Sequence, residues 1–249
     1  MPRVLVCDWD ETITTKDTTS LVAQTAYVHK QNLPPFDTFV QMYLDAAAKF
    51  AAQKLPRSSV EEEEQYQRRA REMEMVSIGA IERAGIFSGL TRADFEAQAS
   101  QVVLRPGFVQ LVAKARETRT PIYIVSVNWS KTFIEAALAL HGVHGIVVRA
   151  NDFEFDNNGI CTGKFDRQWD IRTGADKKEE LESVRAAHAA AHVIYVGDSS
   201  GDVLPLRVAD TGVVMRGGRA RDAFASLPAL ARMAPGVFEG DFFDLAHAW

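Results

Sequence analysis

Five short apolar runs constrain the fold of this chain more than any other feature. Each is rich in Val and Ile and lacks the polar alternation of a strand with one solvent-facing side, as expected for parallel strands covered on both faces. The runs lie at 3–7, 121–127, 145–149, 191–197 and 211–215. Helix-like patterns separate the later runs, at 129–140 and at 176–190, where Asp176 is the expected N-cap. Strand–helix–strand alternation of this kind predicts an α/β domain with a parallel sheet.

A long helical block interrupts this pattern just after the first run. Residues 16–104 contain no strand-like segment. Helix-like patterns lie at 22–30, 36–52, 61–84 and 91–103. Gly85 is the expected end of the third helix, because glycine readily adopts the left-handed conformation that closes many helices. We therefore predict an all-helical cap domain at 16–104, inserted into a core domain formed by 1–15 and 105–249.

Two local patterns add detail. The segment 152–165 reads as a β-hairpin, with Phe153 and Phe155 on one face and Asn157-Asn158-Gly159 as the turn. The acidic run Glu61–Glu64 reads as the solvated start of a helix, where negative charge suits the positive end of the helix dipole.

Composition narrows the classes of partner. The formal net charge of −5 argues against nucleic acid or an anionic membrane, since both favour a basic surface. No apolar stretch approaches the ~18 residues of a membrane span, and no signal-peptide pattern is visible. Two cysteines, Cys7 and Cys161, are too few for a disulfide framework and indicate reduced thiols. We predict a cytoplasmic protein with a small-molecule partner, either a monomer or a homodimer.

Polar and charged residues gather where the predicted strands end. Asp8 and Asp10 follow the first run, Ser126 and Asn128 the second, and the segment 197–202 the fourth. Open α/β sheets bind ligands at the carboxyl ends of their strands, so these side chains are expected to meet at one edge. The helix near Asp176 brings Lys177 and Lys178 toward the same region.

Such a cluster suits phosphoryl transfer. Carboxylates that face one point repel each other, and a bound cation removes the repulsion; oxygen-only ligands such as Asp8 and Asp198 point to Mg²⁺. A serine hydroxyl and neighbouring N–H groups hold phosphate oxygens, and a lysine supplies positive charge. Residues i and i+2 of a strand face the same side. Asp8 and Asp10 can therefore both address one substrate while Trp9 faces away, one as nucleophile and the other as proton donor and acceptor.

The four groups also resemble a known family. Asp8-Trp9-Asp10-Glu11-Thr12 resembles the first motif, DxDx(T/V), of the haloacid dehalogenase-like phosphohydrolases, and Ser126 after its apolar run resembles the second. Lys177 suits the third motif, and GDSSGD at 197–202 resembles the fourth, GDxxxD. The order and spacing agree over most of the chain. The helical insert resembles the C1-type cap of the phosphoserine-phosphatase-like branch.

This resemblance implies a Rossmann-like three-layer α/β/α sandwich. It also implies an Mg²⁺-dependent phosphatase that hydrolyses a small phosphomonoester through an aspartyl-phosphate intermediate. By the same resemblance, Asp8 is the nucleophile and an Mg²⁺ ligand, and Asp10 is the general acid/base, with its backbone carbonyl on Mg²⁺. Asp198 ligates Mg²⁺, and Asp202 does so directly or through water. The implied catalytic and phosphate-binding residues are Asp8, Trp9, Asp10, Ser126, Val127 and Lys177.

The resemblance leaves the substrate open. Val127-Asn128-Trp129 stands where phosphoserine phosphatases carry a glycine pair. Asp17 lies nine positions after Asp8, where a glutamate of those enzymes contacts the substrate's amino group, so Asp17 and Asn128 are predicted to contact substrate. A related arrangement is found in the domain attached to some thiamin-biosynthetic TenA-type proteins, which act on thiamin monophosphate. The substrate candidates are therefore thiamin monophosphate, phosphoserine-like amino acid phosphates and other small phosphates. The alternative for Asp17 is an acid at the start of a helix.

The sequence leaves three alternatives open. Lys178 competes with Lys177 for the place of the motif lysine. A phosphotransferase or mutase of the same family would carry all four motifs and would differ only in the acceptor of the phosphoryl group. A non-catalytic, regulatory protein that binds a phosphate ligand could also use this scaffold.

Overall fold

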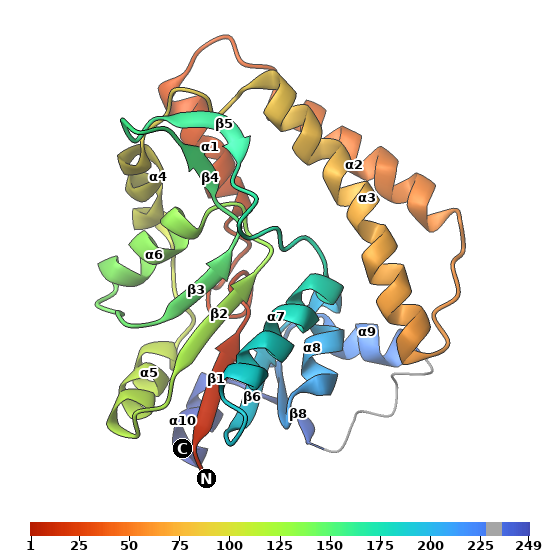
Figure 1. Cartoon of the computed structure of the whole chain (residues 1–249), viewed down its shortest axis with the longest axis vertical. Coiled ribbons are helices and arrows are strands. Elements are labelled where there is room, and N and C mark those ends of the chain that lie inside the picture. The colour runs from red at the N-terminus through yellow and green to blue at the C-terminus, as the bar shows by residue number, and fades with distance from the viewer. Residues whose placement is uncertain (228–235) are drawn as a thin grey trace.

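The centre of the molecule is a six-stranded parallel sheet, in a computed structural model that describes residues 1–227 and 236–249. The strand order is β3-β2-β1-β6-β7-β8 (Figure 1). The strands are β1 (Arg3–Cys7), β2 (Ile122–Ser126), β3 (Val147–Ala150), β6 (His192–Gly197), β7 (Thr211–Met215) and β8 (Val237–Gly240). All five predicted runs form strands. The edge strand β8, a run of four residues, was not predicted.

Alternate residues of β1 pack into two separate cores, one on each face of the sheet. Leu5 and Cys7 face a core formed with α5 (Phe108–Glu117), α6 (Lys131–Leu140) and α10 (Phe242–Ala248). Val4 and Val6 face a core formed with α7 (Gly174–Ala187), α8 (Val203–Val208) and α9 (Ala220–Ser226). This period-two pattern places helices on both faces. It confirms the predicted α/β/α sandwich.

The segment between β1 and β2 is helical, as predicted. It contains α1 (Thr19–His29), α2 (Phe36–Ala51), α3 (Val60–Ala84), α4 (Arg92–Gln98) and the short 3₁₀ helix η1 (Ala99–Gln101). Figure 1 shows α2 and α3 side by side, away from the six-stranded sheet, whereas α1 packs on α4. α4 also packs on α6, and α3 contacts α7, so both helices touch the sandwich. The domain boundaries at 15/16 and 104/105 stay a prediction.

The predicted hairpin links this helical segment to the sandwich. It is formed by β4 (Phe153–Phe155) and β5 (Cys161–Phe165), which pair antiparallel. The Phe153 ring lies 4.4 Å from that of Phe87 and 4.8 Å from that of Phe95, centroid to centroid. These aromatic contacts fix one end of the helical segment against the sandwich.

Helix ends correct two local predictions and confirm another. Gly85 ends α3 in the left-handed conformation, with φ of 59°, as expected. Asp176 is not an N-cap: Thr173 takes that place, and Asp176 is the third residue of α7, where its carboxylate accepts from the Thr173 N–H at 2.9 Å. The acidic run at the start of α3 is not fully solvated, because Glu63 is buried and pairs with Arg57 at 2.5 Å.

Candidate active site

Asp8 lies where the pairing of β1 with β6 ends. Its N–H donates to the Val196 carbonyl at 2.9 Å, which continues the ladder one step beyond Cys7. The side chain is 4% exposed. The chain then turns sharply through Glu11, whose φ of 56° lies in the left-handed region. The sheet register thus fixes Asp8 at the carboxyl ends of two adjacent strands.

Asp10 is held in place by three donors. The Thr18 N–H and hydroxyl donate to one carboxylate oxygen at 2.7 and 2.6 Å, and the Asn128 side-chain amide donates to the other at 2.8 Å. Burial and the nearby charge of Asp17 raise the pKa of Asp10 to about 6, against these hydrogen bonds. The Trp9 ring is buried and donates to the Thr18 hydroxyl at 3.0 Å. The Trp9 ring and the Asp10 carboxylate therefore meet at the same Thr18 hydroxyl, and the strand period does not extend to these residues, because β1 ends at Cys7.

Three buried carboxylates and one lysine form the centre of the site. Oxygen atoms of Asp8, Asp198 and Asp202 all lie within 4.8 Å of one another. Lys177 Nζ donates to Asp8 at 2.7 Å and to Asp202 at 2.8 Å. Burial, together with repulsion from Asp202, raises the pKa of Asp8 well above its usual range, although Lys177 opposes the shift. Burial lowers the pKa of Lys177, but the two carboxylates outweigh it and raise that pKa.

Lys178 points elsewhere. It pairs with Glu64 of α3 at 2.9 Å and with Glu182 of its own helix at 3.2 Å. Successive residues of a helix project about 100° apart, so only one of the two lysines can face the strand ends. Lys177 is that lysine.

Asp202 already has its hydrogen-bonding capacity filled. One oxygen accepts from Lys177 and from the Tyr195 hydroxyl, at 2.8 and 2.7 Å. The other accepts from the Asp198 N–H and from the N–H and hydroxyl of Ser199, at 2.9 to 3.1 Å. A carboxylate offers about four lone-pair sites. Asp202 is close enough to Asp8 and Asp198 to share a cation with them. Its hydrogen bonds, however, indicate that its role is to orient Lys177 and the turn after β6.

Asp8 and Asp198 keep free lone pairs and fit a hard cation better. Within the described ranges, 1–227 and 236–249, the Asp8 carboxylate accepts only from Lys177 and from the Thr12 hydroxyl, the latter at 3.3 Å. Thr12 also reaches Asp198 at 3.1 Å. Burial and Asp202 raise the pKa of Asp198 to about 6. Three carboxylates against one lysine leave an excess of negative charge in a buried place, and all the donors are oxygen. This donor set fits Mg²⁺.

The end of β2 and the residues that follow it adjoin Asp10. Ser126 is buried, and its hydroxyl oxygen accepts from the Asn128 N–H at 3.0 Å. The Asn128 amide is engaged with Asp10 and Thr18, which favours a positioning role for it over direct contact with substrate. The Val127 carbonyl accepts from the Asn151 side chain at 3.0 Å.

Asp17 is exposed, and its carboxylate accepts from the Thr19 N–H at 2.7 Å. This bond supports the start of α1, which is the simpler of the two expected roles. Asp17 also lines a cavity of about 550 Å³ between α2, α3 and the strand ends. Val127 lines the same cavity, so the cavity reaches the residue next to Ser126.

Sequence reasoning missed Thr18, Tyr195 and Arg172. Thr18 ties Asp10 to Trp9, Tyr195 holds Asp202, and Arg172 lines the cavity. Tyr195 carried a signal, since a hydroxyl in an otherwise aliphatic buried strand needs a partner. Arg172 carried none, because an arginine five residues before a helical lysine normally faces solvent.

In the described part of the chain, no helix combines the length and apolarity needed to cross a membrane.

A family model described as haloacid dehalogenase-like hydrolase matches residues 5–207. A CTO1 family protein of Schizosaccharomyces pombe is 30% identical over 226 residues, covering 85% of this chain and 81% of the relative.

Solved structures share the fold. Phosphoserine phosphatase in its apo form superposes with a TM-score of 0.58 at 13% identity, covering 100% of this chain and 99% of that one. A phospho-aspartyl intermediate analogue of phosphoserine phosphatase superposes with a TM-score of 0.55 at 14% identity, covering 96% and 94%. The family match spans most of the chain, and the sandwich is the expected one: the chain belongs to the haloacid dehalogenase-like hydrolase family.

Proposed function

We propose that this protein is an Mg²⁺-dependent phosphatase that hydrolyses a small phosphomonoester through an aspartyl-phosphate. The observation that carries the proposal is the placement of Asp8. It lies within 2.7 Å of Lys177 and beside Asp198, at strand ends that also bear Ser126. An in-line displacement at phosphorus requires a nucleophilic carboxylate, a buried positive charge and a hydroxyl that can bind phosphate oxygens.

The reaction proceeds in two displacements. An Asp8 carboxylate oxygen attacks phosphorus, the bond from phosphorus to the leaving oxygen breaks, and that oxygen takes a proton from Asp10. Asp10 then removes a proton from water, whose oxygen attacks the same phosphorus. The bond to Asp8 breaks, inorganic phosphate leaves, and both carboxylates regain their starting states. Thr18 and Asn128 hold Asp10 in place for both proton transfers.

The remaining residues bind and neutralise the phosphoryl group. The Ser126 hydroxyl and the backbone N–H groups of Trp9, Asp10 and Val127 are proposed to hold its oxygens, and Lys177 balances its charge together with that of Asp8. When bound by Asp8, Asp198 and the Asp10 carbonyl, Mg²⁺ would neutralise the negative charge that attack brings to a site already rich in carboxylates. Asp202 would act behind this group, through Lys177.

Residues 16–104 are proposed to act as a C1-type cap. The cavity between α2, α3 and the strand ends opens beside Asp17 and Val127, which favours a small substrate enclosed by the cap. Thiamin monophosphate, phosphoserine-like amino acid phosphates and other small phosphates are the substrate candidates that sequence reasoning suggested. A cytoplasmic location and a monomeric or homodimeric state stay predictions.

The test is phosphate release from a panel of phosphorylated metabolites with Mg²⁺, with Asp8→Asn as the blank. The wild type is expected to release phosphate from at least one small phosphomonoester. The variant should lose activity by about 10³-fold or more, since it keeps the shape of the site but not the nucleophile. Undiminished activity in Asp8→Asn would contradict the mechanism. Transfer of phosphate to an added alcohol in place of water would identify a phosphotransferase, and tight binding without turnover a regulatory protein.

A further inference from the structure

Arg172 is a buried cation whose guanidinium is only partly satisfied. The residue is 5% exposed and lies between β5 and α7. Its Nε donates to Asp170 at 2.8 Å, and its guanidinium carbon lies 4.7 Å from the centre of the Phe165 ring. Among the described residues, its two terminal nitrogens, Nη1 and Nη2, are the buried side-chain polar atoms with no hydrogen-bond partner.

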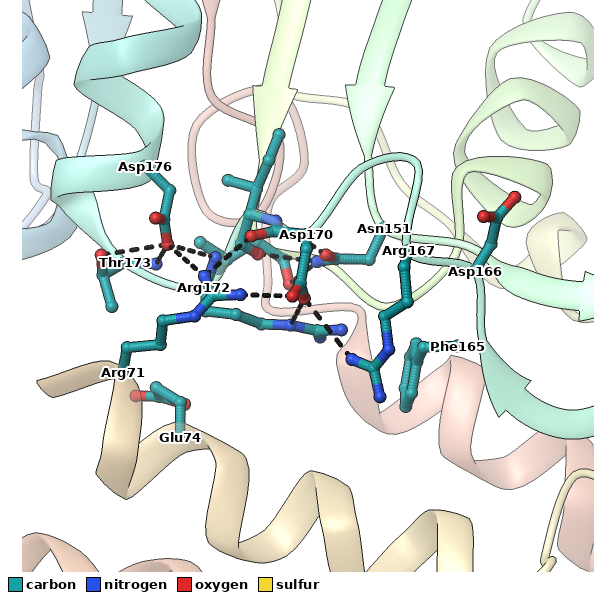
Figure 2. A network of polar contacts seen from close by, with 12 residues as sticks. Arg71, Glu74, Asn151, Phe165, Asp166, Arg167, Asp170, Arg172, Thr173 and Asp176 are labelled. Carbon is teal, nitrogen blue, oxygen red and sulfur yellow. Dashed lines mark hydrogen bonds and ion pairs between the residues drawn. The ribbon is translucent and has the colours of Figure 1, made fainter. Parts of the chain in front are cut away.

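The surrounding charges do not satisfy Arg172. Figure 2 shows three arginines converging on the carboxylate of Asp170. That carboxylate is therefore shared between Arg71, Arg167 and Arg172. Glu74, on α3, lines the same cavity as Arg172. Burial raises the pKa of Glu74, and this effect exceeds the opposing effect of the Arg172 charge. A buried charged donor without an acceptor destabilises a protein by more than a typical neutral hydrogen bond stabilises it. An acceptor supplied by a ligand would therefore stabilise this arrangement.

Arg172 lines the cavity that leads away from Ser126. The cavity, about 550 Å³, has the size of a pocket for a small organic ligand. Besides Arg172, its charged lining residues are the carboxylates Asp17 and Glu74. Its remaining walls are largely aromatic and aliphatic: Phe36, Phe39, Tyr43, Ile78, Ile81 and Trp129. The Trp129 ring meets that of Phe36 edge to face, with centroids 6.3 Å apart. A cavity of this kind accommodates a flat apolar group, with polar recognition confined to a few side chains.

We propose that this cavity binds the leaving group of the substrate, that this group is an aromatic ring bearing an oxygen acceptor remote from the phosphate, and that Arg172 binds that oxygen. The inference rests on the proposed function, because it places the phosphate at Asp8 and Ser126. The two terminal nitrogens of a guanidinium form a fork that suits a carboxylate or a pair of carbonyl oxygens. Arg172 lies just before α7 and not in the helical segment 16–104, so the predicted core domain would supply this specificity contact.

The experiment compares two phosphomonoesters that differ by one group. For the wild type with Mg²⁺, kcat/KM for 4-carboxyphenyl phosphate should exceed that for phenyl phosphate by about tenfold or more, the value of a charge-assisted hydrogen bond. Arg172→Met keeps the length of the side chain and removes the donors. In this variant the preference should fall to within about twofold of unity, mainly through KM.

Arg167→Met is the matched control. Arg167 shares Asp170 but lines a different surface, and it pairs with Glu82 at 3.0 Å. Its loss should leave the preference for the carboxylated ester intact. A purely structural role for Arg172 would lower kcat/KM for both esters by the same factor and would leave their ratio unchanged.

A wild-type measurement keeps the inference testable if Arg172→Met does not fold. Benzoate should inhibit hydrolysis of phenyl phosphate competitively, and benzyl alcohol should inhibit at least about tenfold more weakly. Hydrolysis of both esters with equal kcat/KM and no inhibition by benzoate would overturn the inference while leaving the phosphatase intact. Absence of hydrolysis of any phosphomonoester, with benzoate still binding in a calorimetric titration, would instead count against the proposed function.

Discussion

The two aspartates that follow β6 have the same chemistry and different surroundings. Asp202 accepts five hydrogen bonds and is fully buried. Burial alone would raise its pKa, but Lys177, Tyr195 and Ser199 outweigh burial and lower it. The Asp198 carboxylate accepts a hydrogen bond from the Thr12 hydroxyl. Among the described residues, its nearest cation is the exposed Arg219, whose Nη2 lies 3.9 Å from Asp198 Oδ2, too far for a hydrogen bond. The residue with unused lone pairs is the one that can give them to a cation.

Substitution of Asp198 and of Asp202 should therefore have different effects on Mg²⁺ affinity. Asp198→Asn is expected to abolish binding of Mg²⁺ at millimolar concentration, because it removes a proposed ligand. Asp202→Asn is expected to weaken binding by about 10–100-fold, as for residues that orient a metal site from behind. Isothermal titration with Mg²⁺ alone measures both, without reference to activity. Equal losses in the two variants would make Asp202 a direct ligand.

Glu74 gives the molecule a pH-dependent stability that can be isolated. Burial, opposed by Tyr43 and Arg172, raises the pKa of Glu74 from 4.5 to about 7. Between these values the folded state holds a proton that the unfolded state has released, so the free energy of unfolding falls as pH rises through this window. Glu74→Gln removes that dependence. Relative to the wild type, the variant should gain on the order of 3 kcal/mol at most between pH 4 and pH 8.

Urea denaturation at the two pH values provides the measurement. Glu72→Gln, an exposed position on the same helix, controls for the removal of one negative charge. A wild-type minus Glu74→Gln difference that stays constant between pH 4 and pH 8 would show that Glu74 is ionised normally in the folded protein.

At the scale of elements, the carboxyl end of β6 depends on close approach between the strand and the turn that follows. A Cβ on Gly197 would lie 2.5 Å from the Cβ and Cγ atoms of Asp202. No real contact is that short, and the nearest atoms belong to a side chain fixed by five hydrogen bonds. Gly197 is thus needed because Asp202 folds back over it to reach Lys177.

Gly197→Ala should therefore destabilise the protein by about 1–3 kcal/mol, the usual cost of overpacking a rigid site. Gly201→Ala, in the same motif, is the matched control: its Cβ would lie 3.6 Å from the nearest atom, the Ser199 hydroxyl oxygen. That variant should stay within about 0.5 kcal/mol of the wild type. Denaturant titration of the three proteins decides the matter, and similar losses in both variants would refute the steric explanation.

At the scale of the whole molecule, α2 and α3 are joined to the sandwich by charged contacts from α3. Arg71 donates to the Asp170 carbonyl at 2.9 Å and to Asp176 at 3.2 Å, and it also pairs with the Asp170 carboxylate. Arg68 pairs with Glu179 at 2.5 Å but is 48% exposed. Exposed ion pairs contribute little, whereas charge-assisted bonds in a partly buried network contribute more.

Arg71→Met should weaken the attachment of α2 and α3 to the sandwich. Amide hydrogen exchange in these helices should accelerate by about tenfold, as expected for the loss of one charge-assisted contact. Arg68→Met should change the same rates by no more than about threefold. Mass spectrometry of the exchanged peptides gives both values. Unchanged exchange in Arg71→Met would mean that apolar packing alone holds the two helices.

Local pattern determined most of the fold. The Val- and Ile-rich runs predicted five of the six strands, because parallel strands buried on both faces need continuous apolar sequence. The helical insert and the hairpin followed from periodicity and turn residues. β8 escaped because four residues carry too little pattern, and Asp176 was misplaced because a capping box offers two polar residues three positions apart as candidates for the cap.

The sequence by itself determined which groups meet at the strand ends, since a parallel sheet brings its carboxyl ends to one edge. Only the tertiary structure decided what each group does there. Asp8 and Lys177 stand 169 positions apart, and Arg71 and Asp170 stand 99 apart. Hydrophobic pattern tells which face of an element is buried, but not which polar side chains it meets once buried. The saturation of Asp202 and the unpaired nitrogens of Arg172 therefore arise from packing between distant segments.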